Sequence, residues 1–412
     1  MVRSIVEISG HIIDSLILPK VLDLIVNLGA EFEILKIQVG HRRADRSVAR
    51  IQIGAATPNE LERVLAKIKE HGALPVETEH DSVELRAAPM AGVFPDGFYS
   101  TTNLPTAVRV NDRWIDVESI EMDCGIGVDV QAMRAQCVPI HRAQPGDLIV
   151  VGHHGVKIFP LERQVPRQTF EFMNNAVSTE QPKGFLIREI AESMKRTRQE
   201  QGRILVVAGP GLVHTGAARY LVELIEHDYV QVLFAGNGLA VHDIESALYG
   251  TSLGVNLDKN IRASEGHQHH LRAINEIRKA GGIKQAVEQN VIQRGIFFTC
   301  VKKNIDFVLA GSIRDDGPLP DVVTDTLRAQ DHMREKAQGV SLALMMATTL
   351  HAIATGNLLP ATVKTVCVDI NPAVVTKLSD RGTFQATGLV TDVEPFLRSL
   401  CQHLRDEQQP TA

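Results

Sequence analysis

The stretch AGNGLAVHDIE, residues 235–245, contains residue types that move protons. His242 is followed directly by Asp243, and an imidazole changes its charge near neutral pH, where a neighbouring carboxylate can tune it. The sequence therefore predicts that His242 and Asp243 form a catalytic acid/base pair. The alternative is a tight bend from a strand into a helix that begins with capping residues.

Two glycine-rich loops could hold a nucleotide. Gly209 and Gly211 lie in AGPGLVHTG, and Gly236, Asn237 and Gly238 lie in AGNG. Glycines let the backbone approach a phosphate, and the N-terminus of a following helix supplies free N–H groups. The first loop departs from the GxGxxG spacing, so alone it also fits a structural turn. Together the two loops favour a nucleotide site.

Polar residues follow two further apolar runs. The loop GSIRDDG could hold the charged ends of an amino acid or a cofactor ribose, or it could be a surface turn whose aspartate caps a helix. Asp369, at the end of KTVCVD, is placed to accept hydrogen bonds from an adenosine ribose. Asn371 precedes a proline and also suits an ordinary helix cap. The candidates in these two loops are Ser312, Arg314, Asp315, Asp316, Asp369 and Asn371.

The elements that position these loops are four apolar, β-rich runs: RILVVAGPG, VQVLFAGNG, IDFVLAGS and KTVCVDINP. A helical stretch follows each run, which is typical of parallel strands buried on both faces. We predict a doubly wound, mainly parallel α/β sheet within residues 161–412, with its ligand at the carboxyl ends of the strands. The apolar segment 340–360 is too short for a membrane span and predicts a buried helix.

The first 160 residues predict two smaller domains. Residues 1–90 read as strand, helix, strand, strand, helix and strand, the ferredoxin-like order, with DSVELRAAP as the last strand and Thr57 with Glu60 as a capping box. Residues 91–160 predict a small β-rich domain. There Glu121, Asp123 and Asp129 alternate with apolar residues, so a solvated strand face is favoured over a metal site.

Composition excludes several classes of protein. A net charge of -6 gives no electrostatic footprint for nucleic acid or anionic lipid. Five scattered cysteines indicate neither a disulfide framework nor a zinc ribbon, so we expect a cytoplasmic protein without a membrane or nucleic-acid partner. His267 and His270 would share a helix face, but no third ligand is evident and no metal is predicted.

Several long motifs resemble the alternate ornithine cyclodeaminase family of archaea, which also forms the C-terminal part of cyanobacterial bifunctional arginine dihydrolase/ornithine cyclodeaminases. They are AGPGLVHTG, FAGNGLAVHDIE, VLAGSIRDDGPLPDV, LHAIATGNLLPA and CVDINPAVVTKLSDRG. The run GHIIDSLILPKVLDLIVNLGAEFEILKIQVG resembles the conserved region named after lysine-oxoglutarate reductase/saccharopine dehydrogenase. The resemblance covers nearly the whole chain. The guanidine-modifying domain of the bifunctional enzymes has no counterpart, so arginine dihydrolase activity is not expected.

The family resemblance implies a lyase that converts L-ornithine to L-proline and ammonia. Tightly bound NAD would be reduced and reoxidised within one turnover. In that reaction Asp315 and Asp316 could hold the distal ammonium of the substrate and Arg314 its carboxylate. We also expect a homo-oligomer, a dimer or a tetramer. The alternatives are an NAD-linked amino-acid dehydrogenase and a non-catalytic sensor of amino acid and NAD.

A more distant resemblance, to the NAD-binding fold of deoxyhypusine synthase, implies positions for the cofactor. By that similarity Gly211, His214 and Thr215 would line the nicotinamide nucleotide. The AGNG loop would lie at the pyrophosphate or ribose, and Asp369 at the adenosine.

Overall fold

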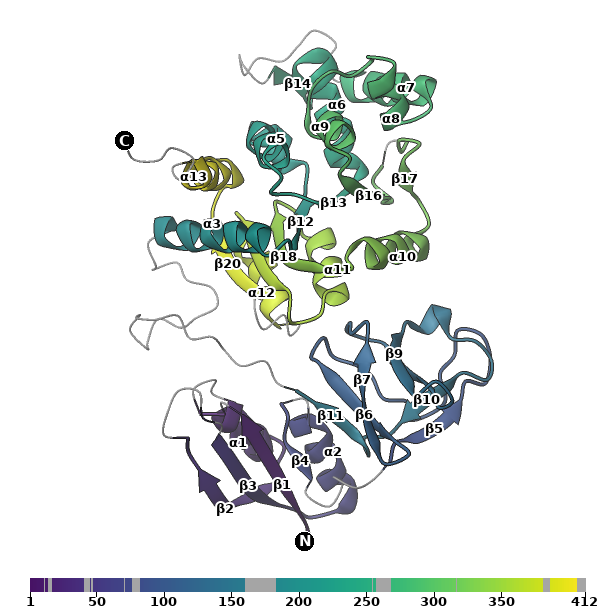
Figure 1. Ribbon diagram of the computed structural model, residues 1–412, viewed down its shortest axis with the longest axis vertical. Helices are drawn as coiled ribbons and strands as arrows, with labels where there is room; N and C mark the ends of the chain where they lie inside the picture. Colours follow the sequence, from purple (N-terminus) through teal and green to yellow (C-terminus); the bar gives the residue numbers. More distant parts are fainter. Residues whose placement is uncertain are drawn as a thin grey trace. The chain divides into compact units, whose positions relative to one another are not determined.

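The computed structural model describes residues 1–10, 12–13, 17–40, 45, 47–69, 71–75, 82–159, 183–253, 255–256, 268–315, 317–380 and 386–405. The chain divides into two compact units (Figure 1). The first comprises Met1–Thr169 with Leu359–Thr362, and the second comprises Phe170–Leu358 with Val363–Ala412. None of the helices in the described ranges combines the length and hydrophobicity that crossing a bilayer requires.

The chain begins with a four-stranded antiparallel sheet in the order β2-β3-β1-β4. That order and the two helices between the strands confirm the predicted ferredoxin-like fold. Buried strand residues such as Val6 and Ile51 pack with Val21 and Val64 of the helices in one core. The elements are β1 (Val2–Gly10), α1 (Ile17–Asn27), β2 (Glu31–Gln38), β3 (Ser47–Ala55), α2 (Pro58–Lys69) and β4 (Leu74–Pro75).

The start of α2 is closed by the predicted capping box. The Glu60 backbone N–H donates to Thr57 Oγ1 (3.3 Å), and the Thr57 N–H donates to Glu60 Oε2 (3.2 Å). The prediction that residues 81–89 supply the last strand of this sheet is wrong. The last strand is β4, whereas β5 (Glu84–Ala87) pairs with a strand of the second sheet.

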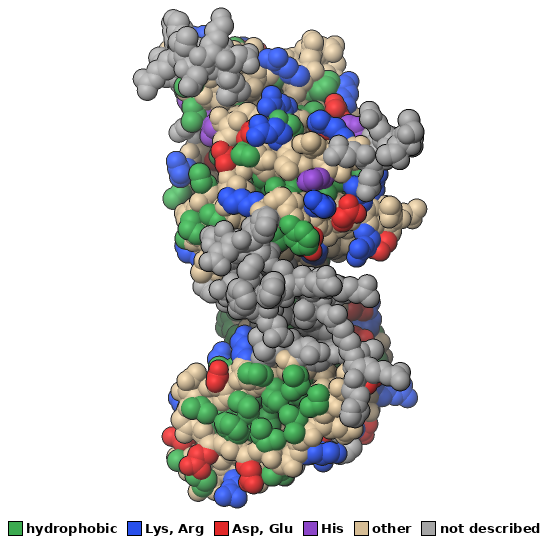
Figure 2. Space-filling model, turned by 90° about the vertical axis from the view of Figure 1, so that its left-hand side faces the viewer, with side chains coloured by type: hydrophobic (Ala, Val, Ile, Leu, Met, Phe, Trp, Pro, Cys, Tyr) green, Lys and Arg blue, Asp and Glu red, His purple; other side chains and the backbone are tan. Residues whose placement is uncertain are grey.

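Strand β2 forms one edge of the ferredoxin-like sheet and is exposed along its whole length. In the described part of the chain it pairs with β3 alone, and all eight of its residues are exposed. Hydrophobic side chains gather on the outer surface of this part of the protein, with charged ones around them (Figure 2, lower half). Among the exposed hydrophobic residues are Phe32, Ile34, Leu35 and Ile37 of β2.

The second sheet confirms a β-rich region within residues 84–158. Its seven strands follow the order β11-β6-β7-β9-β8-β10-β5. The expectation that Glu121 lies on a solvated face is wrong, because Glu121 is buried and accepts a hydrogen bond from Cys124 Sγ (3.0 Å). The remaining strands are β6 (Thr106–Val110), β7 (Arg113–Glu118), β8 (Gly125–Asp129), β9 (Arg134–Val138), β10 (Leu148–Val151) and β11 (Val156–Ile158).

The second unit is built on a seven-stranded parallel sheet, which confirms the predicted α/β fold. Its order is β17-β16-β13-β12-β18-β19-β20, and every neighbouring pair runs parallel. The strands are β12 (Arg203–Ala208), β13 (Val232–Gly236), β16 (Asp306–Ala310), β17 (Val322–Val323), β18 (Val340–Met346), β19 (Lys364–Asp369) and β20 (Ala386–Val390).

Helices cover both faces of this sheet (Figure 1). One group of helices, α3, α5, α9 and α13, packs together. The others contact the sheet directly: α10 packs against β16, α11 against β12 and β13, and α12 against β19 and β20. The helices are α3 (Lys183–Gln199), α4 (Gly211–His214), α5 (Ala218–Glu226), α6 (Asn237–Tyr249), α7 (His269–Ala280), α8 (Ile283–Glu288), α9 (Ile296–Lys303), α10 (Thr326–Lys336), α11 (Leu350–Leu358), α12 (Pro372–Asp380) and α13 (Val393–Arg405).

The segment predicted as one buried helix, residues 340–360, is instead the central strand β18 followed by the helix α11. The strand is buried on both faces and therefore carries no alternation of polar residues. Its place beside β12 gives the sheet the strand order of a Rossmann fold. Strands β13 and β16 are added on one side of β12, and β18, β19 and β20 are added on the other, so the strand order switches between β12 and β18. Ligands bind at such a switch point.

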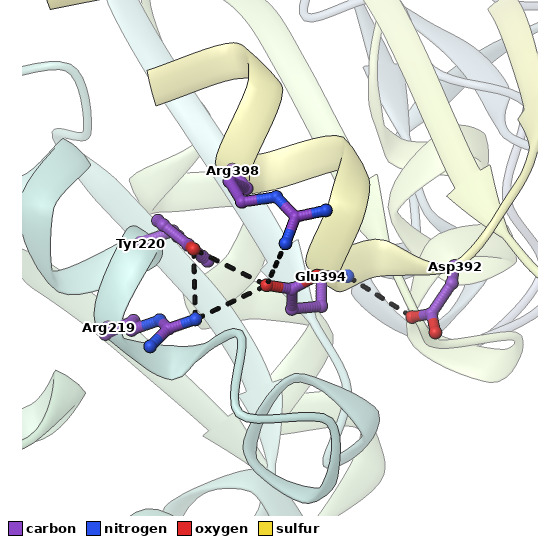
Figure 3. A network of polar contacts seen from close by, with 5 residues as sticks. All are labelled: Arg219, Tyr220, Asp392, Glu394 and Arg398. Atoms are coloured by element: carbon purple, nitrogen blue, oxygen red, sulfur yellow. Dashed lines mark hydrogen bonds and ion pairs between the residues drawn. The ribbon is translucent and has the colours of Figure 1, made fainter. Parts of the chain in front are cut away.

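A polar network joins the first turn of α5 to the first turns of α13 (Figure 3). Glu394 accepts hydrogen bonds from Tyr220, from Arg219 (3.4 Å) and from Arg398 (3.5 Å). Asp392 accepts from the Glu394 N–H (3.2 Å) and so caps α13. The network fixes the start of α5, the helix that follows the first glycine-rich loop.

Candidate active site

The carboxyl ends of the central strands lie level with one another. Ala208 of β12 is in register with Ala235 of β13 and with Met346 of β18, and Gly236 is in register with Ala310 of β16. The loops that follow these strands therefore meet at one edge of the sheet, as predicted from the sequence.

The first glycine-rich loop packs against the end of β18. The Gly209 N–H donates to the Met346 carbonyl (3.0 Å), and a Cβ on Gly209 would lie 1.9 Å from the Ala347 carbonyl oxygen. A Cβ on Gly211 would lie 3.0 Å from the Cβ of Ala347. Gly209 is thus required for the close approach of the two loops at the switch point, and a side chain at Gly211 would press against Ala347. Thr215 closes this turn by donating from its hydroxyl to the Gly211 carbonyl (2.8 Å).

The second glycine-rich loop accommodates a histidine that the sequence analysis did not identify. A Cβ on Gly236 would lie 2.9 Å from Cε1 of His351. Burial lowers the pKa of His351, whereas its hydrogen bond to the Ala310 carbonyl and the nearby Asp315 act to raise it. Gly236 is therefore small because the α11 histidine packs against it. A Cβ on Gly238 would meet only ordinary contacts with Pro210 of the first loop.

Asn237 connects the same loop to a distant one. Its side chain is buried, and its Oδ1 accepts a hydrogen bond from the Leu319 N–H (3.1 Å). This bond holds the segment that leads into β17 against the end of β13.

Two histidines meet beside these loops. His214, at the end of α4, and His242, on α6, contact each other edge to face with ring centroids 4.7 Å apart. His242 Nδ1 lies 2.9 Å from Glu245 Oε2, and His214 Nδ1 lies 2.7 Å from Ser252 Oγ. Nδ1 of each ring thus has a hydrogen-bond partner among the described residues, which holds the orientation of the ring.

Glu245 organises the cluster. Its carboxylate is fully buried and accepts hydrogen bonds from the Thr251 hydroxyl (2.8 Å) and from the Leu253 N–H (3.2 Å), besides its contact with His242. The Thr251 hydroxyl also lies 2.8 Å from Nδ1 of His269. A buried carboxylate with several donors holds its neighbours in fixed positions.

The two rings differ in their electrostatic environment. The pKa of His214 is lowered to about 4, mainly by burial and also by the nearby His242, while Glu245 acts in the opposite direction. His214 is therefore neutral near pH 7. His242 instead has the buried Glu245 carboxylate at its Nδ1.

The predicted pairing of His242 with Asp243 is wrong. Asp243 is buried, and its two oxygens accept hydrogen bonds from the Ile296 N–H (2.9 Å) and the Phe297 N–H (3.0 Å). Asp243 thus caps α9. Burial raises its pKa to about 6, although the two backbone donors act to lower it.

The loop after β16 is folded on itself. The Asp315 carboxylate accepts from the Ser312 N–H (2.9 Å), and the Ser312 hydroxyl accepts from the Arg314 N–H (3.2 Å). Arg314 is exposed, which leaves its guanidinium accessible to a ligand. Asp316 lies outside the described residues, as does His267.

The loop after β19 is a helix cap. Asp369 accepts from the Asn371 N–H (2.8 Å), and the Asn371 side chain accepts from the Ala373 N–H at the start of α12 (3.0 Å). Asn371 therefore has the capping role that its position before Pro372 suggested. Asp369 is buried at the strand end, level with Val390 of β20.

Sequence reasoning missed Glu245 and His351. Glu245 is three residues after His242, so both lie on one face of α6, and this spacing was available as a signal. His351 gave no such signal, because its position depends on packing between α11 and β13.

Three family models cover most of the chain. The model described as "LOR/SDH bifunctional enzyme conserved region" matches residues 3–104. The model "Arginine dihydrolase ArgZ-like, C-terminal, first region" matches residues 105–187. The model "Arginine dihydrolase ArgZ-like, C-terminal, Rossmann fold" matches residues 188–400, the segment that forms the parallel sheet.

Known proteins resemble the chain along nearly its whole length. An ornithine cyclodeaminase of Methanothermobacter thermautotrophicus is 52% identical, with 97% of each protein covered. The apo crystal structure of ArgZ, a cyanobacterial arginine dihydrolase, matches with a TM-score of 0.86 and 38% identity, covering 99% of this chain and 59% of that one.

The third match is a ligand-bound structure. It is the ternary complex of AgrE with ornithine and NAD+ (TM-score 0.55, 38% identity, 100% of this chain and 58% of that chain). AgrE is the bifunctional arginine dihydrolase/ornithine cyclodeaminase of a Nostoc species. Identity of about half the residues over nearly the full length of an archaeal relative confirms the resemblance, and the chain belongs to the ornithine cyclodeaminase family.

Proposed function

We propose that the protein converts L-ornithine to L-proline and ammonia with a bound NAD that is regenerated in each turnover. The observation that carries the proposal is the His214–His242–Glu245 cluster beside the strand ends of a Rossmann-type sheet. Archaeal relatives of 47–52% identity bear the name ornithine cyclodeaminase, and the related AgrE was crystallised with ornithine and NAD+.

The residues at the switch point fit NAD. Gly209 and Gly211 let the first loop pack closely against the end of β18, at the switch point where dinucleotides bind in sheets of this type. Asp369 lies at the end of β19, two strands from β12 and thus about 10 Å away, a span that a dinucleotide bridges. We assign the pyrophosphate to the two glycine-rich loops, including Asn237 and Gly238, and the adenosine ribose to Asp369.

When bound, NAD supplies the acceptor and later the donor of one hydride. The protein must move the protons. One proton leaves the δ-ammonium of the substrate so that this nitrogen can attack the oxidised α-carbon. Another proton goes to the α-nitrogen so that it departs as ammonia.

His214 and His242 are suited to these two tasks. His214 is neutral near pH 7 and has a ring nitrogen that can accept a proton in passing, and His242, held at its Nδ1 by Glu245, can pass a proton to the leaving nitrogen. Their ring contact at 4.7 Å keeps both within the space of one small substrate. Both histidines come from the helices α4 and α6, which follow β12 and β13.

The charged ends of ornithine need partners of opposite charge. We assign the carboxylate to Arg314 and the distal ammonium to Asp315, because both residues follow β16 at the same edge of the sheet. From the sequence alone, Asp316 is a second candidate for the ammonium. Ser312 and Thr215 would then border the cofactor. His351 lies between Gly236 and the Asp315 loop and would separate the two parts of the site.

We place the enzyme in the cytoplasm as a homo-oligomer. Its five cysteines are all free and buried, which suits a reducing compartment. The chain covers 58% of the length of the bifunctional relative from Synechocystis.

The test is turnover of L-ornithine by the purified protein, with proline and ammonia quantified together with absorbance of the reduced cofactor. A cyclodeaminase yields proline and ammonia in equal amounts with no net reduced cofactor. An NAD-linked dehydrogenase would instead accumulate reduced cofactor in step with substrate loss.

A further inference from the structure

The edge strand β2 exposes four large hydrophobic side chains along its length. All eight residues of EFEILKIQ are exposed, and Phe32, Ile34, Leu35 and Ile37 are 38–48% exposed. On the α1 side of the edge, Val26 is 58% exposed. A long, apolar edge strand is a template for pairing with another strand.

A β-bulge gives this strand an unusual side-chain pattern. Ile34 pairs with Ile51 of β3, and Lys36 pairs with Arg50, so Leu35 is an extra residue in β2. An extra residue shifts the alternation by one. Glu33 before the bulge and Lys36 after it therefore lie on the same side of the sheet, away from its core.

The apolar residues follow the same logic. Phe32 is opposite Ile53 and Ile37 is opposite Ala49, and both of these β3 residues belong to the core. Phe32 and Ile37 consequently lie on the helix-covered side of the sheet. Residues at equal distances from the midpoint between Ile34 and Leu35 therefore lie on the same side of the sheet: Glu33 with Lys36, and Phe32 with Ile37.

We propose that β2 is the dimerisation edge of the protein, pairing antiparallel with β2 of a second copy about a two-fold axis between Ile34 and Leu35. This register places Glu33 opposite Lys36 of the second copy, and Phe32 opposite Ile37. Residues that face each other then share one side of the sheet, as antiparallel pairing requires. The two four-stranded sheets become one continuous sheet.

The charges of the strand support this occupant over an unrelated partner. Within one chain Lys36 faces Arg50, which is paired with Glu7 (2.5 Å). Among the described residues, neither Glu33 nor Lys36 has an ion-pair partner. In the dimer, Glu33 of each copy lies opposite Lys36 of the other, which makes two attractive pairs. Glu33 of the second copy then offsets the repulsion between Lys36 and Arg50.

The first experiment measures the mass of the full-length protein by analytical ultracentrifugation. The wild type is expected to sediment as a dimer or as an assembly built from it. Glu33→Lys and Lys36→Glu each replace two attractive pairs with repulsive ones and should weaken association by about tenfold or more. The double variant with both changes restores the pairs and should return association to near the wild-type level.

The second experiment tests the register by crosslinking, which is possible because the five native cysteines are buried. Glu33→Cys with Lys36→Cys should form a covalent dimer under mild oxidation. Within one strand these positions are about 10 Å apart and cannot form a disulfide. The matched control, Phe32→Cys with Lys36→Cys, puts the thiols on opposite sides of the sheet and should stay uncrosslinked.

Each result decides the proposal. A wild type that is monomeric at tens of micromolar overturns it. So does an oligomer whose mass is unchanged in both single variants, or a charge swap that fails to restore association. Equal crosslinking in the two cysteine variants would also overturn the register. Because these residues lie outside the Rossmann-type unit, ornithine turnover is measured separately and its loss does not count for or against the dimer.

Discussion

Replacing Glu245 by glutamine removes the charge beside His242 and keeps the shape of the side chain. The His242 Nδ1 to Glu245 Oε2 distance is 2.9 Å. A hydrogen bond to a charged group is worth about 1.5–3 kcal/mol. Glutamine keeps the shape of the contact and loses the charge. If the loss falls on the transition state, it corresponds to a decrease in kcat of about 10- to 10²-fold.

The assay is steady-state formation of proline from ornithine at saturating NAD, accompanied by a measurement of the NAD that remains bound. We expect kcat to decrease and NAD retention to stay unchanged, since Glu245 lies behind His242 rather than at the glycine-rich loops. Asp243→Asn is the matched control because it removes the neighbouring buried carboxylate. It should lower the free energy of unfolding by about 1 kcal/mol, through the weaker cap of α9, with kcat within a few-fold of wild type. Glu245→Gln with near wild-type kcat, or Asp243→Asn with the larger loss of kcat, would refute the assignment of Glu245.

Three further predictions concern the loops around this cluster. Gly209→Ala puts a Cβ 1.9 Å from the Ala347 carbonyl oxygen. It should lower the free energy of unfolding by about 1–3 kcal/mol and weaken NAD binding. Gly184→Ala, where a Cβ meets nothing within 4 Å, is the control, and equal melting temperatures of the two variants would contradict the close packing at the switch point. Gly236→Ala should displace His351 and lower turnover, and the Gly236→Ala/His351→Ala double variant should recover part of the lost stability in a denaturant titration; no recovery would mean that the two residues are not in contact. His214 has a pKa of about 4 in the folded protein and an ordinary value of 6.5 when unfolded, so the unfolded state binds more protons between these values and stability decreases as pH falls from 6.5 to 4. In denaturant titrations across that range, His214→Gln should lose less stability than wild type; parallel curves would falsify the shift.

The sequence predicted the strands of the parallel sheet well, because RILVVA, VQVLFAG and KTVCVD are continuous apolar runs that end in small or polar residues. It failed at β18, where VSLALMM passes without a polar break toward the apolar helix α11. Periodicity cannot separate a strand buried on both faces from a buried helix. Recognising β18 would have shown the Rossmann order and the switch point directly.

The sequence predicted where the candidate site lies, but not which side chains contact each other in it. His214, His242 and the two glycine-rich loops meet at one edge of the sheet, since parallel strands align their carboxyl ends. Adjacency in sequence suggested Asp243 as the partner of His242, whereas neighbouring helical residues diverge and the residue three positions on shares the face. The contacts of Asp243 with α9 and of His351 with Gly236 join segments more than fifty residues apart, which no local pattern reveals.

The central claim is tested most directly by the stoichiometry of one reaction. Protein loaded with NAD is incubated with L-ornithine, and proline, ammonia and reduced cofactor are followed together over many turnovers. The account predicts one proline and one ammonia for each ornithine consumed, with no net reduced cofactor. No proline from NAD-loaded, folded protein, or reduced cofactor that accumulates with each ornithine consumed, would contradict it.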